Sequence, residues 1–265
     1  QQNLSFQLMP PFISGSEVPD VTSRLADALK FSGIISIAYG IFCFLLPHTP
    51  PKQNAVEKFA FKKAFKLFNY SSFTVLVLAS LSVSIIHQIY FLQTGPFLSH
   101  IGIKDSQIGP AMTIGQFAEI LTMAYLGYFL KRLGFKKVIF IGVLAYFARY
   151  AIFGTVILPV WVMVISQAFH GFCYAFFFAA AYIYVDKIAD EDVRHSAQTV
   201  FGIIILGGGP VIGGWLSGKL QEIYTTSGIF DYSGFWYTLS AMGLITGLLF
   251  FFLFTNQLKD DTKIA

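Results

Sequence analysis

Two charged side chains lie deep inside apolar stretches of this sequence. Glu119 lies within the otherwise uncharged stretch Ile108–Leu130, and Arg149 is the one charge in Val138–Leu158. An ionised side chain near the centre of a bilayer costs at least about 2.5–3.5 kcal/mol on insertion scales, so membrane proteins keep such charges mainly where they are used. These two residues therefore point to a transport or sensing site.

The two charges are expected at the same depth. Glu119 precedes Lys131 and Arg149 follows Lys137 by about 12 residues each, or roughly 18 Å at the helical rise. One interpretation is a buried ion pair that only holds two helices in register. The other is that Glu119 faces a water-accessible cavity, where it binds a solute, a proton loaded from the outer side, or both. Gln116 lies one turn from Glu119 on the same helical face.

Other polar groups are expected at mid-membrane depth, namely His87 and Gln88 in one apolar stretch and His170 and Tyr174 in another. His170 and Tyr174 share a helical face because they are four residues apart. An intramembrane histidine serves either as a hydrogen-bond partner between helices or as a ligand group. The sequence has no metal-ligand spacing, nucleophile elbow, phosphate loop or dinucleotide fingerprint. We therefore expect no enzyme, no cofactor, no metal site and no nucleic-acid partner.

The composition makes a lipid bilayer the expected solvent. Hydrophobic residues make up 55% of the chain and charged residues only 12%, mean hydropathy is +0.64, and there are 30 phenylalanines. This is too apolar for one or two soluble domains. The cysteines, Cys43 and Cys173, both lie in apolar runs, so no disulfide framework is expected. The predicted fold class is an all-α integral membrane protein.

A hydrocarbon core of about 30 Å requires about 20 apolar residues per helix. The stretches that qualify, separated by proline, glycine and polar connectors, are Ala26–Leu46, Tyr70–Gln93, Gln107–Leu130, Lys136–Leu158, Val160–Tyr184, Ala197–Leu220 and Gly234–Phe254. The sequence therefore predicts seven transmembrane helices.

Basic residues are concentrated in alternate connectors. The connectors after the first, third and fifth stretches and the C-terminal tail carry most of them, whereas the opposite set carries few. Because cytoplasmic loops are enriched in lysine and arginine, Lys52 and Lys136 are expected inside and Lys104 outside. This predicts a multi-pass protein of the cell inner (plasma) membrane with a cytoplasmic C-terminus and an external N-terminus.

Two further patterns leave alternatives open. In the segment Glu57–Phe68, Phe61, Phe65 and Phe68 share one face among lysines, which suits a short helix on the inner membrane surface; a solvated loop is the alternative. The small-residue pairs Gly209/Gly213 and Gly214/Gly218 allow close helix packing. The neighbouring Gly-Pro break could also act as a gating hinge.

Several motifs together resemble one family. The loop 127–137 partly matches the G-x-L-x-D-R-x-G-R-R loop of the major facilitator superfamily, with Lys131 at the acidic position. The more specific stretches are Leu46–Pro51, Gly115-Gln-Phe-Ala-Glu119, Arg149-Tyr150, His170–Phe177 and Arg194–Gln198. With them the sequence resembles the nucleoside:proton symporter family within that superfamily, over nearly the whole chain.

The resemblance implies a truncated twelve-helix bundle, in which the seven stretches are helices six to twelve. Residues 1–25 would be an external loop at the end of a missing N-terminal half, and 26–46 a transmembrane helix. Residues 47–69 would be the cytoplasmic inter-half loop with its amphipathic helix, 70–255 the C-terminal six-helix half, and 256–265 a cytoplasmic tail. The start at Gln1, without methionine, agrees with a fragment whose partner is the missing half.

The resemblance also implies a solute site. The family's contact residues match Gln88, Gln116, Glu119, His170 and Tyr174, while Phe91 stands where relatives have asparagine and Ala175 where an acid is common. Glutamine and glutamate suit sugar hydroxyls, and Tyr174 and Phe91 suit base stacking.

The expected function is therefore proton-coupled nucleoside uptake, with Glu119 and Arg149 as the proton-coupling residues and the solute, protons and the bilayer as partners. The alternatives are a facilitator or symporter of another small polar solute such as a sugar and, less in keeping with the motifs, a seven-span receptor.

Overall fold

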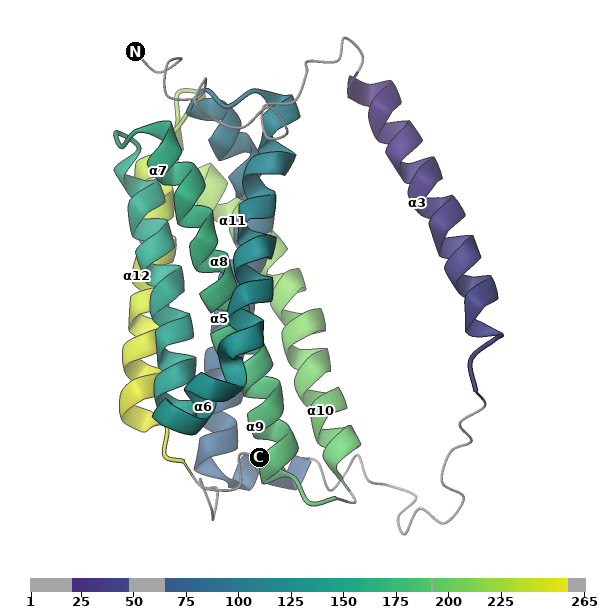
Figure 1. Cartoon of the computed structure of the whole chain (residues 1–265). Helices are drawn as coiled ribbons and strands as arrows, with labels where there is room; N and C mark the ends of the chain where they lie inside the picture. The colour runs from purple at the N-terminus through teal and green to yellow at the C-terminus, as the bar shows by residue number, and fades with distance from the viewer. Residues whose placement is uncertain (1–20, 48–64, 192, 257–265) are drawn as a thin grey trace.

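The computed structural model describes residues 21–47, 65–191 and 193–256. Helices dominate the described residues, and those from residue 71 onward run up and down a common bundle (Figure 1). Five of them, within the described part of the chain, are long and apolar enough to cross a membrane: Ser71–His100, Asp105–Thr155, Val160–Ile188, Arg194–Ile223 and Tyr232–Leu253. Each overlaps one of the predicted apolar stretches over most of its length, and the second overlaps two.

The longest helix, α6 (Asp105–Thr155), is broken at Gly134, where φ is 74° and ψ is 166°. Residues that carry a side chain rarely adopt this backbone conformation, so the glycine permits the sharp turn. The two arms of α6 on either side of Gly134 correspond to the predicted stretches Gln107–Leu130 and Lys136–Leu158. The turn lies at the same end of the bundle as the connection between α9 (Ala180–Ile188) and α10 (Arg194–Gly202) (Figure 1).

Two of the membrane-length helices change their winding on the way. The first is built from α7 (Val160–Ile165), the 3-10 turn η2 (Ser166–Ala168), α8 (Phe169–Gly171), the π-helix η3 (Phe172–Ala179) and α9. The second consists of α10, the π-helix η4 (Ile203–Gly208) and α11 (Gly209–Ile223). π-helical turns occur often at functional sites, because they redirect side chains within a helix.

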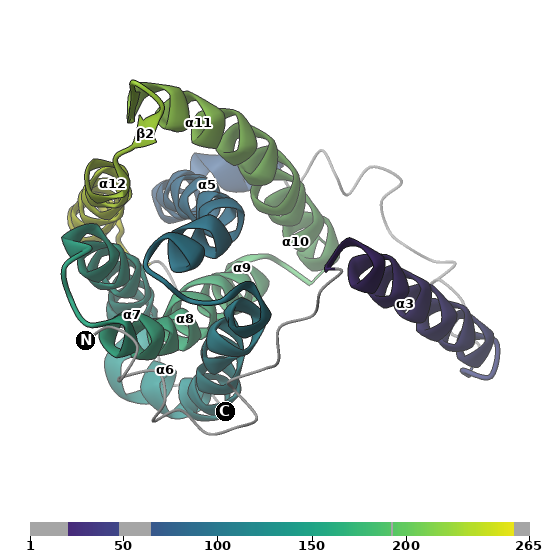
Figure 2. The same ribbon diagram turned by 90° about the horizontal axis from the view of Figure 1, so that it is seen from above.

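Seen from above, α5 (Ser71–His100) runs through the interior of the bundle, with α11 and α12 (Tyr232–Leu253) beside it (Figure 2). Glycines allow the closest helix crossings. A Cβ at Gly213 would lie 2.9 Å from the Cβ of Gln88, and one at Gly209 would overlap Ser84, so α11 rests directly on α5. This supports the packing interpretation for the Gly209/Gly213 pair. Apart from the local helix backbone, no heavy atom of the described residues lies within 4 Å of the same position at Gly214 or Gly218.

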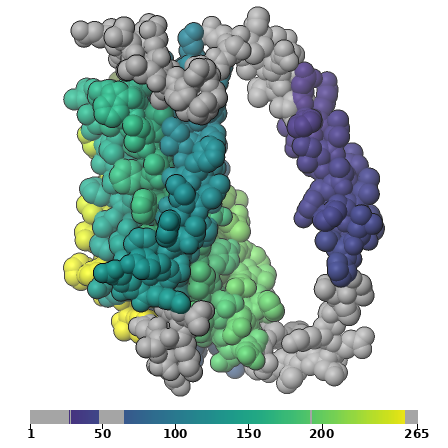
Figure 3. Space-filling model, viewed as in Figure 1, coloured from purple at the N-terminus to yellow at the C-terminus, as the bar shows by residue number. Residues whose placement is uncertain are grey.

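The N-terminal helix α3 (Val21–Cys43) stands clear of the bundle (Figures 2 and 3). Its described part Leu29–Cys43 is apolar but shorter than the five membrane-length helices. The predicted stretch Ala26–Leu46 is therefore largely helical, but the count of seven transmembrane helices stays a prediction.

The structure departs from an all-helical prediction between α11 and α12. Here β1 (Thr225–Thr226) and β2 (Ile229–Phe230) pair antiparallel, with Thr225 opposite Phe230. Ser227 and Gly228 between them both have positive φ, the conformation of a two-residue hairpin turn. The sequence predicts only a loop at this position, because strands of two residues are too short to show an alternating pattern.

The predicted surface helix Glu57–Phe68 lies mostly outside the described residues. Its described end leads into the 3-10 helix η1 (Lys66–Asn69). The ring of Phe68 packs edge-on against Phe73, with the centroids 5.0 Å apart, and so joins η1 to the start of α5.

Candidate functional site

A fully buried guanidinium forms the centre of the candidate site. Arg149 lies on the second arm of α6, and its Cζ is 3.9 Å from the ring centroid of Tyr90, 5.1 Å from that of Tyr150 and 5.6 Å from that of Tyr146. Aromatic faces attract a cation because of the ring quadrupole, most strongly where water is excluded. Nη2 of Arg149 also donates to the Tyr150 hydroxyl at 3.3 Å. The three tyrosines thus hold a buried positive charge.

His170 connects this cation to the rest of the site. It lies in α8, is buried, and its Nδ1 is 3.2 Å from Nη1 of Arg149. Its ring stacks on that of His87 from α5, with centroids 5.5 Å apart and planes 16° from parallel. His87 in turn shares a 2.8 Å hydrogen bond between its Nδ1 and the Tyr146 hydroxyl.

Glu119 approaches His170 from the first arm of α6. Its Oε2 is 3.8 Å from Nε2 of His170, and its side chain is 24% exposed. No ion pair joins Glu119 to Arg149 among the ion pairs of the described residues. The direct pair that equal depth suggested is not formed; instead both residues reach His170.

Glycines explain why both arms of α6 meet the helix that carries His170. A Cβ at Gly171 would lie 2.5 Å from the carbonyl carbon and oxygen of Ala118, on the first arm. A Cβ at Gly142, on the second arm, would lie 2.7 Å from the backbone nitrogen of Phe177. Each arm therefore packs backbone against backbone on α8–η3, and Glu119 and Arg149 face this helix.

A pocket of about 470 Å³ lies beside the histidine pair. Its lining comes from α5, α6, η3, α9, η4 and α11: Ser84, His87, Gln88, Phe91, Met123, Tyr174, Phe178, Ala179, Tyr182, Ile205, Leu206 and Pro210. The rings of Phe91 and Tyr174 are 46% and 38% exposed, and Phe91 meets His87 edge-on at 4.9 Å. The pocket thus combines aromatic walls with a few polar groups, as small-molecule sites do.

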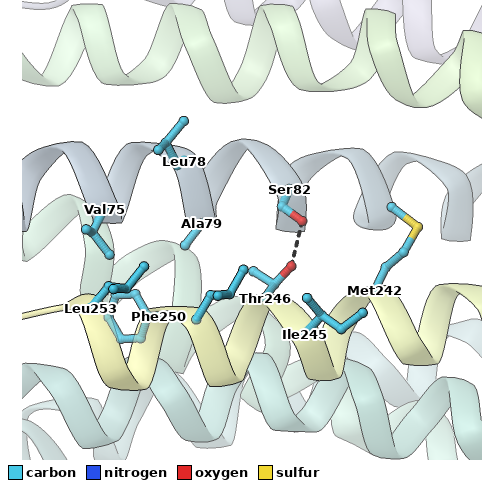
Figure 4. Close-up of a pocket in the computed structure, with 10 residues that line it drawn as sticks. Val75, Leu78, Ala79, Ser82, Met242, Ile245, Thr246, Phe250 and Leu253 are labelled. Carbon is cyan, nitrogen blue, oxygen red and sulfur yellow. Dashed lines mark hydrogen bonds between the residues drawn. The ribbon is translucent and has the colours of Figure 1, made fainter.

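A second pocket, of about 370 Å³, lies between α5 and α12 (Figure 4). Its walls are mostly apolar, and its polar feature is the 2.7 Å hydrogen bond between Ser82 and Thr246. Because these two hydroxyls bond each other, this pocket offers little to orient a polar solute. The pocket beside His87 is the better candidate.

The structure brings most, but not all, of the predicted site residues together. Gln88, Phe91 and Tyr174 line the 470 Å³ pocket, and His170 stacks behind it on His87 and contacts Glu119. Gln116 is exposed and is not among the residues that line the pocket. In the described part of the chain, no group of three metal-ligating side chains is assembled.

The sequence reasoning missed the residues that surround Arg149. Tyr90 donates to Gln167 Oε1 at 2.8 Å, and Tyr150 bonds the Ile86 carbonyl at 3.4 Å, so both tyrosines are fixed. One signal was available: Tyr146 lies three residues before Arg149 and four before Tyr150, so it shares a helical face with each of them.

The comparison with known families decides what kind of protein carries this site. The model of the nucleoside H+ symporter family matches residues 14–259. The chain belongs to the nucleoside H+ symporter family. It is 30% identical over 242 residues to the transporter YegT of Escherichia coli (strain K12), which covers 86% of this chain. It is 28% identical over 248 residues to the nucleoside permease NupG of the same strain, which covers 85% of it.

A solved structure gives the same result for the fold. A crystal structure of a NupG mutant superposes with a TM-score of 0.71 at 26% identity, covering 81% of this chain and 57% of that chain. The chain spans 56% of YegT and 58% of NupG, little more than half of their lengths. With its apolar helices, the chain is thus a multi-pass membrane protein of a transporter family rather than an enzyme.

Proposed function

We propose that this chain forms the C-terminal part of a twelve-helix transporter of the major facilitator superfamily that takes up nucleosides together with protons. The observation that carries the proposal is a polar and aromatic pocket of about 470 Å³ whose His87 stacks on His170, with the partly exposed acid Glu119 3.8 Å from His170, in a chain of this family. A pocket of this size suits a drug-sized ligand. Because its side chain is 24% exposed, Glu119 can exchange a proton with water.

The roles of the residues in and around this pocket follow from side-chain chemistry, with Gln116 and Glu119 outside its lining. Gln88, Gln116 and Glu119 hydrogen-bond the sugar hydroxyls, while Phe91 and Tyr174 stack on the base, together with His170 behind them. Glu119 carries the coupled proton, and the buried charge of Arg149 biases it through His170. The exposed rings of Phe91 and Tyr174 support this assignment, because large aromatics exposed beside buried polar groups are available to a solute.

The domain boundaries follow the resemblance. Residues 1–25 close the N-terminal half, 26–46 form its sixth helix, 47–69 connect the halves along the inner surface, 70–255 form the second half, and 256–265 are a cytoplasmic tail. The bundle from α5 to α12 and the separate position of α3 support this division (Figure 1).

The proposed orientation places the C-terminus in the cytoplasm and the transporter in the cell inner membrane. The Gly134 turn, with Lys131 and Lys136 around it, shares one end of the bundle with the α9–α10 connection, whereas Lys104 lies between α5 and α6 at the other end (Figure 1). The basic end is the cytoplasmic end by the positive-inside rule.

Uptake of radiolabelled uridine by proteoliposomes containing the full-length protein tests the function. We expect accumulation above equilibrium when the outside is acidic, and its loss when a protonophore is added. Binding and uptake of a hexose, with no competition by nucleosides, would instead identify a sugar transporter. Absence of binding and uptake for purine and pyrimidine nucleosides alike would refute the proposal. No observation in the described residues favours a receptor.

A further inference from the structure

The hydrogen bond from Arg149 fixes the tautomer of His170. A guanidinium carries only donors and stays protonated in proteins. Because Nη1 of Arg149 is 3.2 Å from Nδ1 of His170, that nitrogen is the acceptor. The single ring proton of a neutral His170 is therefore on Nε2. A second proton would place two positive charges side by side in a buried site, so His170 stays neutral beside Arg149.

The ring nitrogen that carries the proton faces Glu119. Nε2 of His170 is 3.8 Å from Oε2 of Glu119, about 1 Å longer than a charge-assisted hydrogen bond. The His170 side chain is 3% exposed and the Glu119 side chain 24% exposed. His170 is held by Arg149 and by stacking on His87, so Glu119 is the partner that moves to close the gap.

We propose that His170 is a positioning residue for the coupled proton: held by Arg149, it presents Nε2–H to the carboxylate of Glu119 and releases it when Glu119 is protonated. This inference rests on the proposed function. The buried charge of Arg149 thereby acts on Glu119 through one neutral ring, without a direct ion pair.

The release follows from donor and acceptor counting. A carboxylate only accepts hydrogen bonds, and it accepts one from Nε2–H. When a proton from water binds Glu119, the charge that strengthened this bond disappears, so the side chain is freed toward the pocket. The proton stays on the carboxyl group, and His170 neither gains nor loses one. A charge change at one residue is thus converted into a movement of one side chain.

Other titratable groups contact His170 or interact with Arg149, and they stay the same in all variants below. They come from α5, from the second arm of α6, and from α8–η3: His87, Tyr90, Tyr146, Arg149, Tyr150, Cys173 and Tyr174.

Three substitutions of His170 separate its two hydrogen bonds. His170→Gln places an amide donor near the position of Nε2 and keeps a donor for Glu119. His170→Asn keeps an acceptor near the position of Nδ1 for Arg149 but has no donor that reaches Glu119. His170→Phe keeps an aromatic ring for stacking on His87 and has neither bond. Ser240→Ala is the matched control, since it removes a hydrogen bond from a buried hydroxyl to the Phe147 carbonyl elsewhere.

The measurement is the external pH at which uridine uptake by the full-length transporter is half-maximal. Loss of the donor makes the carboxylate easier to protonate, so the midpoint is expected to rise by about one pH unit in His170→Asn and His170→Phe. His170→Gln is expected to restore the midpoint toward wild type. In a Glu119→Gln background no carboxylate titrates, so the residual downhill uptake should lack this pH dependence and the His170 substitutions should not shift its pH profile, because a double-mutant cycle reports only coupled residues.

A wild-type midpoint in both donorless variants would overturn the inference, as would equal shifts in His170→Gln and His170→Asn or a shift that persists in Glu119→Gln. His170→Phe carries the test if His170→Asn does not yield monodisperse protein. Absence of uridine binding and uptake in the wild type would instead refute the proposed function, so the two failures are distinguishable.

Discussion

Replacement of Gly171 by alanine tests the crossing that places His170 beside Glu119. The new Cβ would lie 2.5 Å from the carbonyl carbon and oxygen of Ala118 and 2.7 Å from the amide nitrogen of Glu119, whereas ordinary contact begins at 3.4 Å. All three atoms belong to backbone, so no flexible side chain can yield. The first arm of α6 and α8 must therefore separate by about 1 Å, since packed interiors have no free space.

The energy follows from two opposing effects. Overpacking typically costs about 1–3 kcal/mol, and replacing a helical glycine by alanine returns roughly 0.5–1 kcal/mol. A net loss of about 1 kcal/mol in the free energy of unfolding is expected for Gly171→Ala. Uridine affinity should fall as well, because the 3.8 Å separation between His170 and Glu119 widens.

Gly127→Ala is the control for this prediction. Gly127 lies on the same arm of α6, and apart from the local helix backbone no heavy atom of the described residues lies within 4 Å of an added Cβ. Only the helix-forming effect remains there, so the protein should be stabilised by up to about 1 kcal/mol. Unfolding of detergent-solubilised protein by a denaturing detergent measures both variants. Equal stability of Gly171→Ala and Gly127→Ala, with unchanged uridine affinity, would refute the predicted close approach.

Three further predictions concern the site, the turn and the orientation. Glu119→Gln keeps shape and hydrogen bonding but cannot titrate, so uridine binding should be largely retained while uptake against a gradient is lost; wild-type accumulation with unchanged pH dependence would show that Glu119 is not the coupling residue. Gly134→Ala, at φ 74° and ψ 166°, should lower the free energy of unfolding by about 1–3 kcal/mol, and unfolding titrations at wild-type values would contradict this. A cysteine at Lys104 should react with a membrane-impermeant reagent added to intact cells and one at Lys136 should not; the reverse pattern would invert the proposed orientation.

The helices of the bundle were predictable because length and hydropathy constrain a membrane helix strongly. The ends of these helices were harder to predict. The predicted stretch Tyr70–Gln93 stops where polar residues begin, but α5 continues to His100. Gln93 is buried and donates to the Ser217 hydroxyl at 3.0 Å. A polar side chain that finds a partner in a neighbouring helix does not end a helix, and the sequence does not reveal that partner.

The sequence predicts the level of the candidate site residues along their helices but not the direction in which their side chains point. Counting residues from the cytoplasmic lysines placed Glu119 and Arg149 at one level. Which way each side chain points depends on the helix that packs on both arms of α6, and the glycines that select it, Gly142 and Gly171, are far apart in sequence. The π-helical winding of Phe172–Ala179 was equally inaccessible, because an apolar run fits α- and π-helical periods alike.

The contact between α11 and α5 has a consequence for any search for variants with altered solute preference. Gly213 lies against the Cβ of Gln88, and Gly209 against Ser84, and both of these α5 residues line the 470 Å³ pocket. A larger residue at either glycine would push on a pocket wall from behind. A genetic selection on nucleoside analogues should therefore recover mutations at Gly209 and Gly213. These mutations would resemble replacements of residues that contact the solute, although they would act by displacing the α5 wall of the pocket.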